Sequence, residues 1–213
     1  QLLRFPDKPP EEAAGVAESW RMARNPTVLL YFVSIFAYVG CEQGTSNWIS
    51  EFLRVYHGVN PRVGGAHAVA GFWGLMTVGC LLGLPLLKWF DGRRVLVATS
   101  VLALVTLSIA LFGSKGWSIV AFPCIGLFAS VMWPVVFSLG MNSVATGHGV
   151  VAGILCTAII GGAFVPAIIG RLGDHFGLRG GMLLLYLTFG WILSVGFWAR
   201  PLVSNTADPK PAC

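Results

Sequence analysis

A carboxylate and four other polar side chains stand close together inside one apolar stretch of the sequence. An acidic residue near the centre of a membrane helix costs roughly 2.5–3.5 kcal/mol, so it usually faces a protein interior or a wet cavity. Residues 27–48, which contain it, are apolar and long enough to cross a bilayer, for which about 20 residues suffice. Amide and hydroxyl groups nearby could donate to or accept from a polyhydroxylated ligand. We therefore predict a binding site made of Tyr38, Glu42, Gln43, Ser46 and Asn47.

The role of Glu42 has two interpretations. The carboxylate could accept hydrogen bonds from a substrate or bind a proton, since it lies on one helix face with Tyr38 and Ser46. Alternatively, it could be a structural group that bonds to a neighbouring helix, and the polar residues around it could serve to hold helices together.

The composition restricts the class of protein. Of the 213 residues, 55% are hydrophobic and 11% are charged, whereas a soluble domain has about 25% charged residues. The 14 basic residues, with a net charge of +5, cluster between apolar runs and form no aromatic-interleaved patch, so we expect no nucleic-acid partner. No nucleophile-base pattern, phosphate-binding loop or metal-ligand spacing occurs in the sequence. We expect an integral membrane protein that is not an enzyme and has no metal site or cofactor.

The apolar runs predict an all-α integral membrane fold with six transmembrane helices. Prolines and glycines predict breaks in the fourth helix around Pro134 and in the fifth around Gly161 and Gly162. We expect residues 1–26 to form a cytoplasmic linker with a short amphipathic helix, residues 27–200 a six-helix half-domain, and residues 201–213 a cytoplasmic tail. The six expected spans are residues 27–52, 63–87, 95–112, 117–140, 150–169 and 182–199.

The order of the spans predicts a repeat and an orientation. The first three spans and the last three share a polar first span, a glycine-rich second span, an acidic loop and an apolar third span. Two three-helix repeats must have inverted topologies, as in many secondary transporters. An even number of spans places both termini on one side, and the basic residues favour the cytoplasmic side of the cell membrane. The start at Gln1, without an initiating Met, is what we expect of a segment of a longer chain.

Several short motifs resemble one known family. They are Tyr38-Val-Gly-Cys-Glu, Trp133-Pro-Val-Val-Phe-Ser-Leu-Gly, Ile159-Ile-Gly-Gly-Ala-Phe-Val-Pro and Gly170-Arg-Leu-Gly-Asp. Together they resemble the C-terminal half of a major facilitator superfamily transporter, in the group of fucose:proton symporters and glucose/galactose transporters. The resemblance covers about residues 26–200.

This resemblance implies a function and partners. It implies half of a twelve-helix secondary transporter that moves fucose or another hexose by alternating access, with proton symport. The partners would be the sugar, the coupling ion, the lipid bilayer and an N-terminal six-helix half. Trp133 would then stack on the sugar ring, since tryptophan has a large apolar face and a polar handle. The alternatives are a membrane sugar sensor or scaffold without transport activity, and an exporter of a drug-like solute.

The resemblance also implies a gating latch. The loop Asp91-Gly-Arg-Arg is similar to the short charged loop that latches helices on the cytoplasmic side, which assigns gating roles to Asp91, Arg93 and Arg94. One departure is Cys80, which stands where this group commonly has an arginine.

Overall fold

The computed structural model describes residues 16–200 and Leu202, and this part of the chain is helical apart from short turns and contains no strand. A single π-helical turn, Pro61–Gly65, precedes α3, and a short 3₁₀ turn, Ala158–Ile160, separates α7 from α8. The α-helices are α1 Val16–Ala23, α2 Pro26–His57, α3 Ala66–Trp89, α4 Gly92–Phe112, α5 Lys115–Ala129, α6 Met132–Met141, α7 His148–Thr157, α8 Gly161–Met182 and α9 Leu184–Trp198.

Five helical segments in the described part are long and apolar enough to cross a membrane. They are Pro26–His57, Pro61–Trp89, Gly92–Phe112, Lys115–Met141 and His148–Met182. The sixth predicted span corresponds to α9, which is apolar but has only 15 residues. The prediction of an all-helical membrane fold is therefore confirmed. The expected tail lies outside the described residues except for Leu202, as does the linker before Val16.

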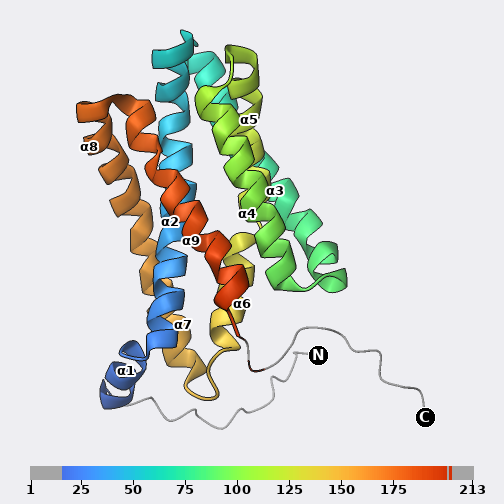
Figure 1. Ribbon diagram of the computed structural model, residues 1–213, viewed down its shortest axis with the longest axis vertical. Coiled ribbons are helices and arrows are strands. Elements are labelled where there is room, and N and C mark those ends of the chain that lie inside the picture. Colours follow the sequence, from blue (N-terminus) through green and yellow to red (C-terminus); the bar gives the residue numbers. More distant parts are fainter. Residues whose placement is uncertain (1–15, 201, 203–213) are drawn as a thin grey trace, which may run out of the picture.

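A glycine makes the turn between the last two helical passes. Gly177 has φ 77° and ψ 154°, a backbone conformation that is open essentially only to glycine, so the regular helix of α8 ends there. Leu183, between α8 and α9, is itself in a right-handed helical conformation. The helix that begins after Gly177 therefore continues into α9 through a single turn residue, Leu183, and Figure 1 shows this passage descending from the tip of α8.

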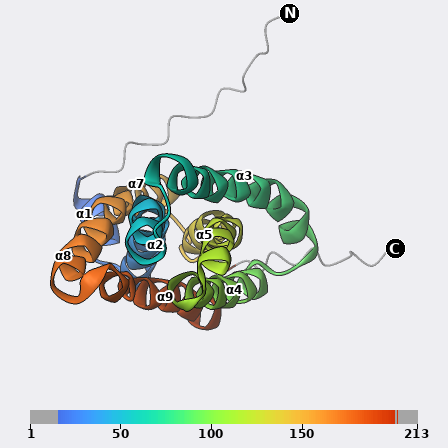
Figure 2. The ribbon, with the colours of Figure 1, turned by 90° about the horizontal axis from the view of Figure 1, so that it is seen from above.

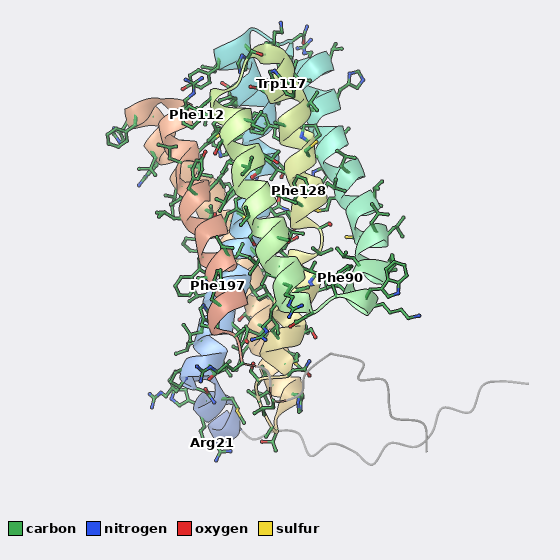
Figure 3. All side chains as sticks on the ribbon, turned by 45° about the vertical axis from the view of Figure 1, so that its right-hand side comes forward. Arg21, Phe90, Phe112, Trp117, Phe128 and Phe197 are labelled. Carbon is green, nitrogen blue, oxygen red and sulfur yellow. The ribbon has the colours of Figure 1, made fainter. Side chains whose placement is uncertain are left out.

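The helices run up and down along the long axis of the molecule, so their connections gather at two ends (Figure 1). The α1 end holds the start of α2, the α3–α4 and α6–α7 connections and the end of α9. The Gly177 end holds the α2–α3 and α4–α5 connections. Figure 3 places Arg21 at the first end and Phe112 and Trp117 at the second. The prediction of membrane orientation from basic residues groups the loops in the same way.

Two helix pairs, α2 with α8 and α3 with α5, form the centre of the bundle. Seen from above, α5 lies between α3 and α4, and α2 lies between α8 and α5 (Figure 2). Both pairs approach closely at glycines, because a Cβ at Gly161 would overlap the Phe36 carbonyl of α2, and a Cβ at Gly126 would overlap the Phe72 carbonyl of α3. The indole nitrogen of Trp191 in α9 donates to Ser34 Oγ in α2 at 3.0 Å.

Candidate functional site

A break separates α5 from α6 in the fourth membrane segment, as the sequence predicts. Ser130 and Val131 form the turn, one helical turn before Pro134. Pro134 has no N–H, so the carbonyl of Ser130 loses its normal helical donor. The thiol of Cys80 in α3 lies 3.7 Å from that carbonyl oxygen and donates to it. A side chain from a neighbouring helix thus satisfies the backbone group that the proline leaves free.

The second break lies in the fifth segment, at the 3₁₀ turn Ala158–Ile160. It comes directly before Gly161 and Gly162, where the sequence predicts it. Gly161 packs against the backbone of α2, and a Cβ at Gly162 would contact the Gln43 side chain at 3.0 Å. The second break therefore lies against the middle of α2, beside the polar residues.

An open cavity of about 630 Å³ connects both breaks with α2. A volume of 300–1,000 Å³ is typical of small-molecule sites. The α3 wall is apolar except for Cys80, and α2 contributes a phenol, a carboxylate and an amide. The cavity is lined by Tyr38, Val39, Glu42, Gln43, Met76, Cys80, Gly83, Leu84, Leu87, Ser130, Val131, Trp133, Pro134 and Ile159.

The carboxylate of Glu42 has one partner in the described structure. Gln43 Nε2 donates to Glu42 Oε1 at 3.3 Å, and both side chains are half-buried at the cavity wall. Within residues 16–200, no hydrogen bond or ion pair joins Glu42 to a neighbouring helix. The carboxylate therefore keeps acceptor capacity on the cavity side.

The aromatic rings of Tyr38, Trp133 and Phe137 pack together, and two of them line the cavity with Glu42. The Tyr38 and Trp133 rings are 5.9 Å apart with an interplanar angle of 57°. Phe137 stacks on Trp133 with centroids 6.1 Å apart and an angle of 15°. Trp133 remains half-exposed, so one side of the indole is available to a ligand in the cavity.

The cavity brings together four of the six residues predicted to bind substrate, namely Tyr38, Glu42, Gln43 and Trp133. Ser46 and Asn47 do not line it. Ser46 is buried, and its hydroxyl donates to the Gln43 carbonyl at 3.4 Å. Asn47 is exposed, one turn beyond Gln43 on α2.

The structure adds residues that the prediction missed. Ser130 could have been found from Pro134, because a proline frees the carbonyl four residues earlier. Met76 and Val39 carry no chemical signal in the sequence, since they are ordinary apolar residues of membrane helices.

Trp48 lies outside the cavity, and its indole nitrogen donates to the Pro166 carbonyl at 3.0 Å, which ties α2 to α8.

The predicted gating residues lie at the α1 end. Asp91 caps α4 by accepting a hydrogen bond from the Arg93 backbone N–H at 2.9 Å, and its other oxygen lies 3.7 Å from Arg93 Nε. The Arg93 guanidinium also donates to the Ala199 carbonyl, at 3.1 Å, at the end of α9. The side chain of Arg94 is exposed. Among the described residues, no group of His, Cys, Asp or Glu could hold a metal ion.

These features define a helical integral membrane protein with a cavity at the breaks of two helices. A family model, the Major Facilitator Superfamily, matches residues 2–159 of the sequence. The chain belongs to this superfamily. Its members are transporters and not enzymes, which confirms that expectation.

The sequence is also similar to individual members of the superfamily. The chain is 32% identical over 208 residues to a glucose/galactose transporter of Brucella abortus biovar 1 (strain 9-941), covering 92% of this chain and 48% of the relative. It is 26% identical over 173 residues to a putative glucose/galactose transporter of Helicobacter pylori (strain ATCC 700392 / 26695), covering 81% and 42%. The chain thus spans about half the length of the curated relatives it matches.

A solved structure has the same fold. The crystal structure of the E. coli fucose:proton symporter FucP superposes with a TM-score of 0.80 at 22% sequence identity, covering 88% of this chain and 46% of that one. The family model and the Brucella relative confirm the predicted resemblance to this superfamily, and the superposition confirms the fold.

Proposed function

We propose that this chain is the C-terminal half of a secondary transporter that moves a hexose across the membrane by alternating access, coupled to protons. The observation that carries the proposal is the cavity in which Glu42, Gln43 and Trp133 meet at the two helix breaks. Its support from relatives is the glucose/galactose transporter of Brucella and the fucose:proton symporter with the same fold. Because the chain spans about half of these proteins, an N-terminal six-helix half would form the other wall.

The cavity chemistry favours a polyhydroxylated solute. A sugar hydroxyl can donate to the Glu42 carboxylate, while Gln43 both donates and accepts. Trp133 offers an apolar face to the carbon-hydrogen side of a pyranose ring. Asn47, exposed one turn further along α2, would complete the site from the edge that faces the other half.

The proposed architecture is two inverted three-helix repeats. The sixth span would consist of residues 178–198, which follow the turn at Gly177 and extend about 30 Å at about 1.5 Å per residue. That length matches the hydrocarbon core of a bilayer. The first repeat would be α2, α3 and α4, and the second would be α5–α6, α7–α8 and this last helix. Residues 27–200 would form this half-domain.

The proposed orientation places the α1 end in the cytoplasm of the cell, at the inner or plasma membrane. Among the described residues, six basic side chains lie at this end and five at the Gly177 end: Arg21, Arg24, Lys88, Arg93, Arg94 and Arg200 against Arg54, Arg62, Lys115, Arg171 and Arg179. An excess of basic residues in short loops is typical of the cytoplasmic side. Residues 1–26 and 201–213 would then be cytoplasmic, and Asp91 with Arg93 would act as a latch on that side.

Transport by the natural protein in liposomes tests the proposal. We expect uptake of labelled glucose, galactose or fucose that is driven by an inward proton gradient and collapses with a protonophore. Glu42→Gln should lower uptake about ten- to hundredfold, because a hydrogen bond to a charged group contributes about 1.5–3 kcal/mol. Glu51→Gln is the matched control on the same helix, since Glu51 pairs with Arg54 outside the cavity. Equal uptake and equal pH dependence in both variants would remove Glu42 from the mechanism.

Thiol labelling tests where the sugar binds. Cys80 and Cys156 are both exposed in the described structure, but only Cys80 lines the cavity. A transported hexose should slow the reaction of Cys80 with N-ethylmaleimide and leave Cys156 unchanged. Protection of neither thiol would place the sugar elsewhere.

A second candidate function draws on the apolar α3 wall. Met76, Leu84 and Leu87 line the cavity opposite Glu42, and such a wall suits a drug-like solute as well as a sugar. An exporter would extrude a lipophilic cation from liposomes and leave labelled hexoses untransported. The two results together would favour export of a drug-like solute over sugar transport.

A further inference from the structure

A groove lies on the other side of the α3–α5 contact. The helices α3 and α4 are joined by a short turn, yet they make few contacts with each other, because each packs on α5. The space left between them is a groove of about 460 Å³. Residues of three helices line it, among them Leu82, Leu86 and Phe90 of α3, Ala98 and Leu102 of α4, and Phe128 of α5.

The groove is cationic at one end and otherwise apolar except for Thr99 and Ser130, whose hydroxyls donate to backbone carbonyls of their own helices. Leu82, Phe90 and Leu102 are 59%, 56% and 46% exposed, which leaves their side chains to the surrounding lipid. Arg94 lines the groove where α4 begins, at the α1 end. From Arg94 to Leu102 the groove follows α4 for about 12 Å at about 1.5 Å per residue. Figure 3 shows Phe90 near that end and Phe128 further along the bundle.

The two neighbouring arginines differ in their partners. Arg93 is held by Asp91 and by the Ala199 carbonyl. Arg94 is exposed, and within the described ranges no carboxylate lies within ion-pair distance of it. The adjacent acid, Asp91, is directed at Arg93 and the first turn of α4. Lys88, also exposed, adds positive charge at the same end of α3.

We propose that this groove binds an anionic phospholipid, with one acyl chain between α3 and α4 and the headgroup phosphate on Arg94. An apolar channel that ends in a guanidinium with no carboxylate partner among the described residues is complementary to a molecule with a long hydrocarbon tail and an anionic head. Arginine suits this role because its planar guanidinium binds phosphate in a bidentate manner. Basic pockets between membrane helices are a recognised way of binding anionic headgroups.

Lipid retention by the natural protein tests this proposal. The purified protein is exchanged into nanodiscs of phosphatidylcholine with phosphatidylglycerol, and bound lipids are counted by native mass spectrometry after release. We expect one retained phosphatidylglycerol, held about fivefold less tightly in Arg94→Gln, the effect of one basic residue near an anionic headgroup. Lys115→Gln, at the Gly177 end, is the matched charge control. Ala98→Phe should displace the tail while keeping the charge, and Val105→Phe is its control on the exposed side of the same helix, outside the groove.

Three outcomes would overturn the proposal. Equal retention in Arg94→Gln and Lys115→Gln would remove the headgroup contact, and retention of phosphatidylcholine to the same extent would remove the preference for an anionic lipid. If Ala98→Phe lowered thermal stability but left the lipid count unchanged, another protein segment would occupy the groove. These results do not depend on sugar transport, so they separate this proposal from the proposed function.

Discussion

The cavity and the groove lie on two sides of one wall, and both are mostly apolar, but they differ in the polar groups that line them. Gly83, Ser130 and Val131 line both, so one wall, where α3 meets the broken α5–α6 helix, is common to the two. The difference comes from the helix that supplies the other wall. The helix α2 brings Tyr38, Glu42 and Gln43 to the cavity, whereas α4 brings to the groove only apolar side chains, Thr99 and the terminal Arg94. If both proposals hold, one scaffold binds two different kinds of molecule.

The largest effect is expected for a variant that disrupts the α3–α5 contact, which forms the wall between the cavity and the groove. A Cβ at Gly79 would overlap Ser130 Oγ and the Leu127 carbonyl, so Gly79→Val must push α3 away from α5. We expect a loss of about 1–3 kcal/mol or more of stability, since overpacking in a close contact costs that much. Thermal unfolding in detergent should show it, together with loss of both sugar binding and lipid retention. Gly74→Val is the control on the same helix, because nothing lies within 4 Å of a Cβ there; equal melting temperatures would mean that the contact is not tight.

A second variant should affect the cavity alone. Trp133→Ala removes the ring that packs between Tyr38 and Phe137. We expect sugar affinity to fall about three- to tenfold, which corresponds to the roughly 0.5–1.5 kcal/mol that aromatic packing contributes. Isothermal calorimetry measures the affinity, and phosphatidylglycerol retention should not change. A simultaneous loss of the lipid would show that the two hollows are coupled through α5–α6.

The smallest effect is expected at the thiol that caps the break. Cys80→Ala leaves the Ser130 carbonyl without the donor seen in the structure, and Cys80→Ser keeps one. The alanine variant should be about 0.5–1.5 kcal/mol less stable than the serine variant, the usual range for one neutral hydrogen bond. Chemical unfolding followed by tryptophan fluorescence compares them. A serine variant less stable than the alanine variant would show that the thiol acts by packing.

The cavity could be predicted in large part from the sequence, and the groove could not. Polar residues such as Glu42 are conspicuous in an apolar span, and Pro134 marks the break, so both signals are local in the chain. The sequence also predicts Ser46 and Asn47 as ligands, because their polar groups suit a polyhydroxylated solute, but in the structure Ser46 is buried and neither residue lines the cavity. The groove depends on how far α3 and α4 diverge, which is set by their separate packing on α5. Its residues, such as Leu82 and Ala98, look like those of any membrane helix.

The hydrogen bond between Trp191 and Ser34 has a consequence for biosynthesis. The two residues are 157 positions apart in the chain, which takes a ribosome about 10–30 s at about 5–20 residues per second. During that interval α2 has entered the membrane without α9, which packs against it in the finished bundle. Until α9 is made, the Ser34 hydroxyl of α2 therefore lacks the indole partner that it has in the finished bundle.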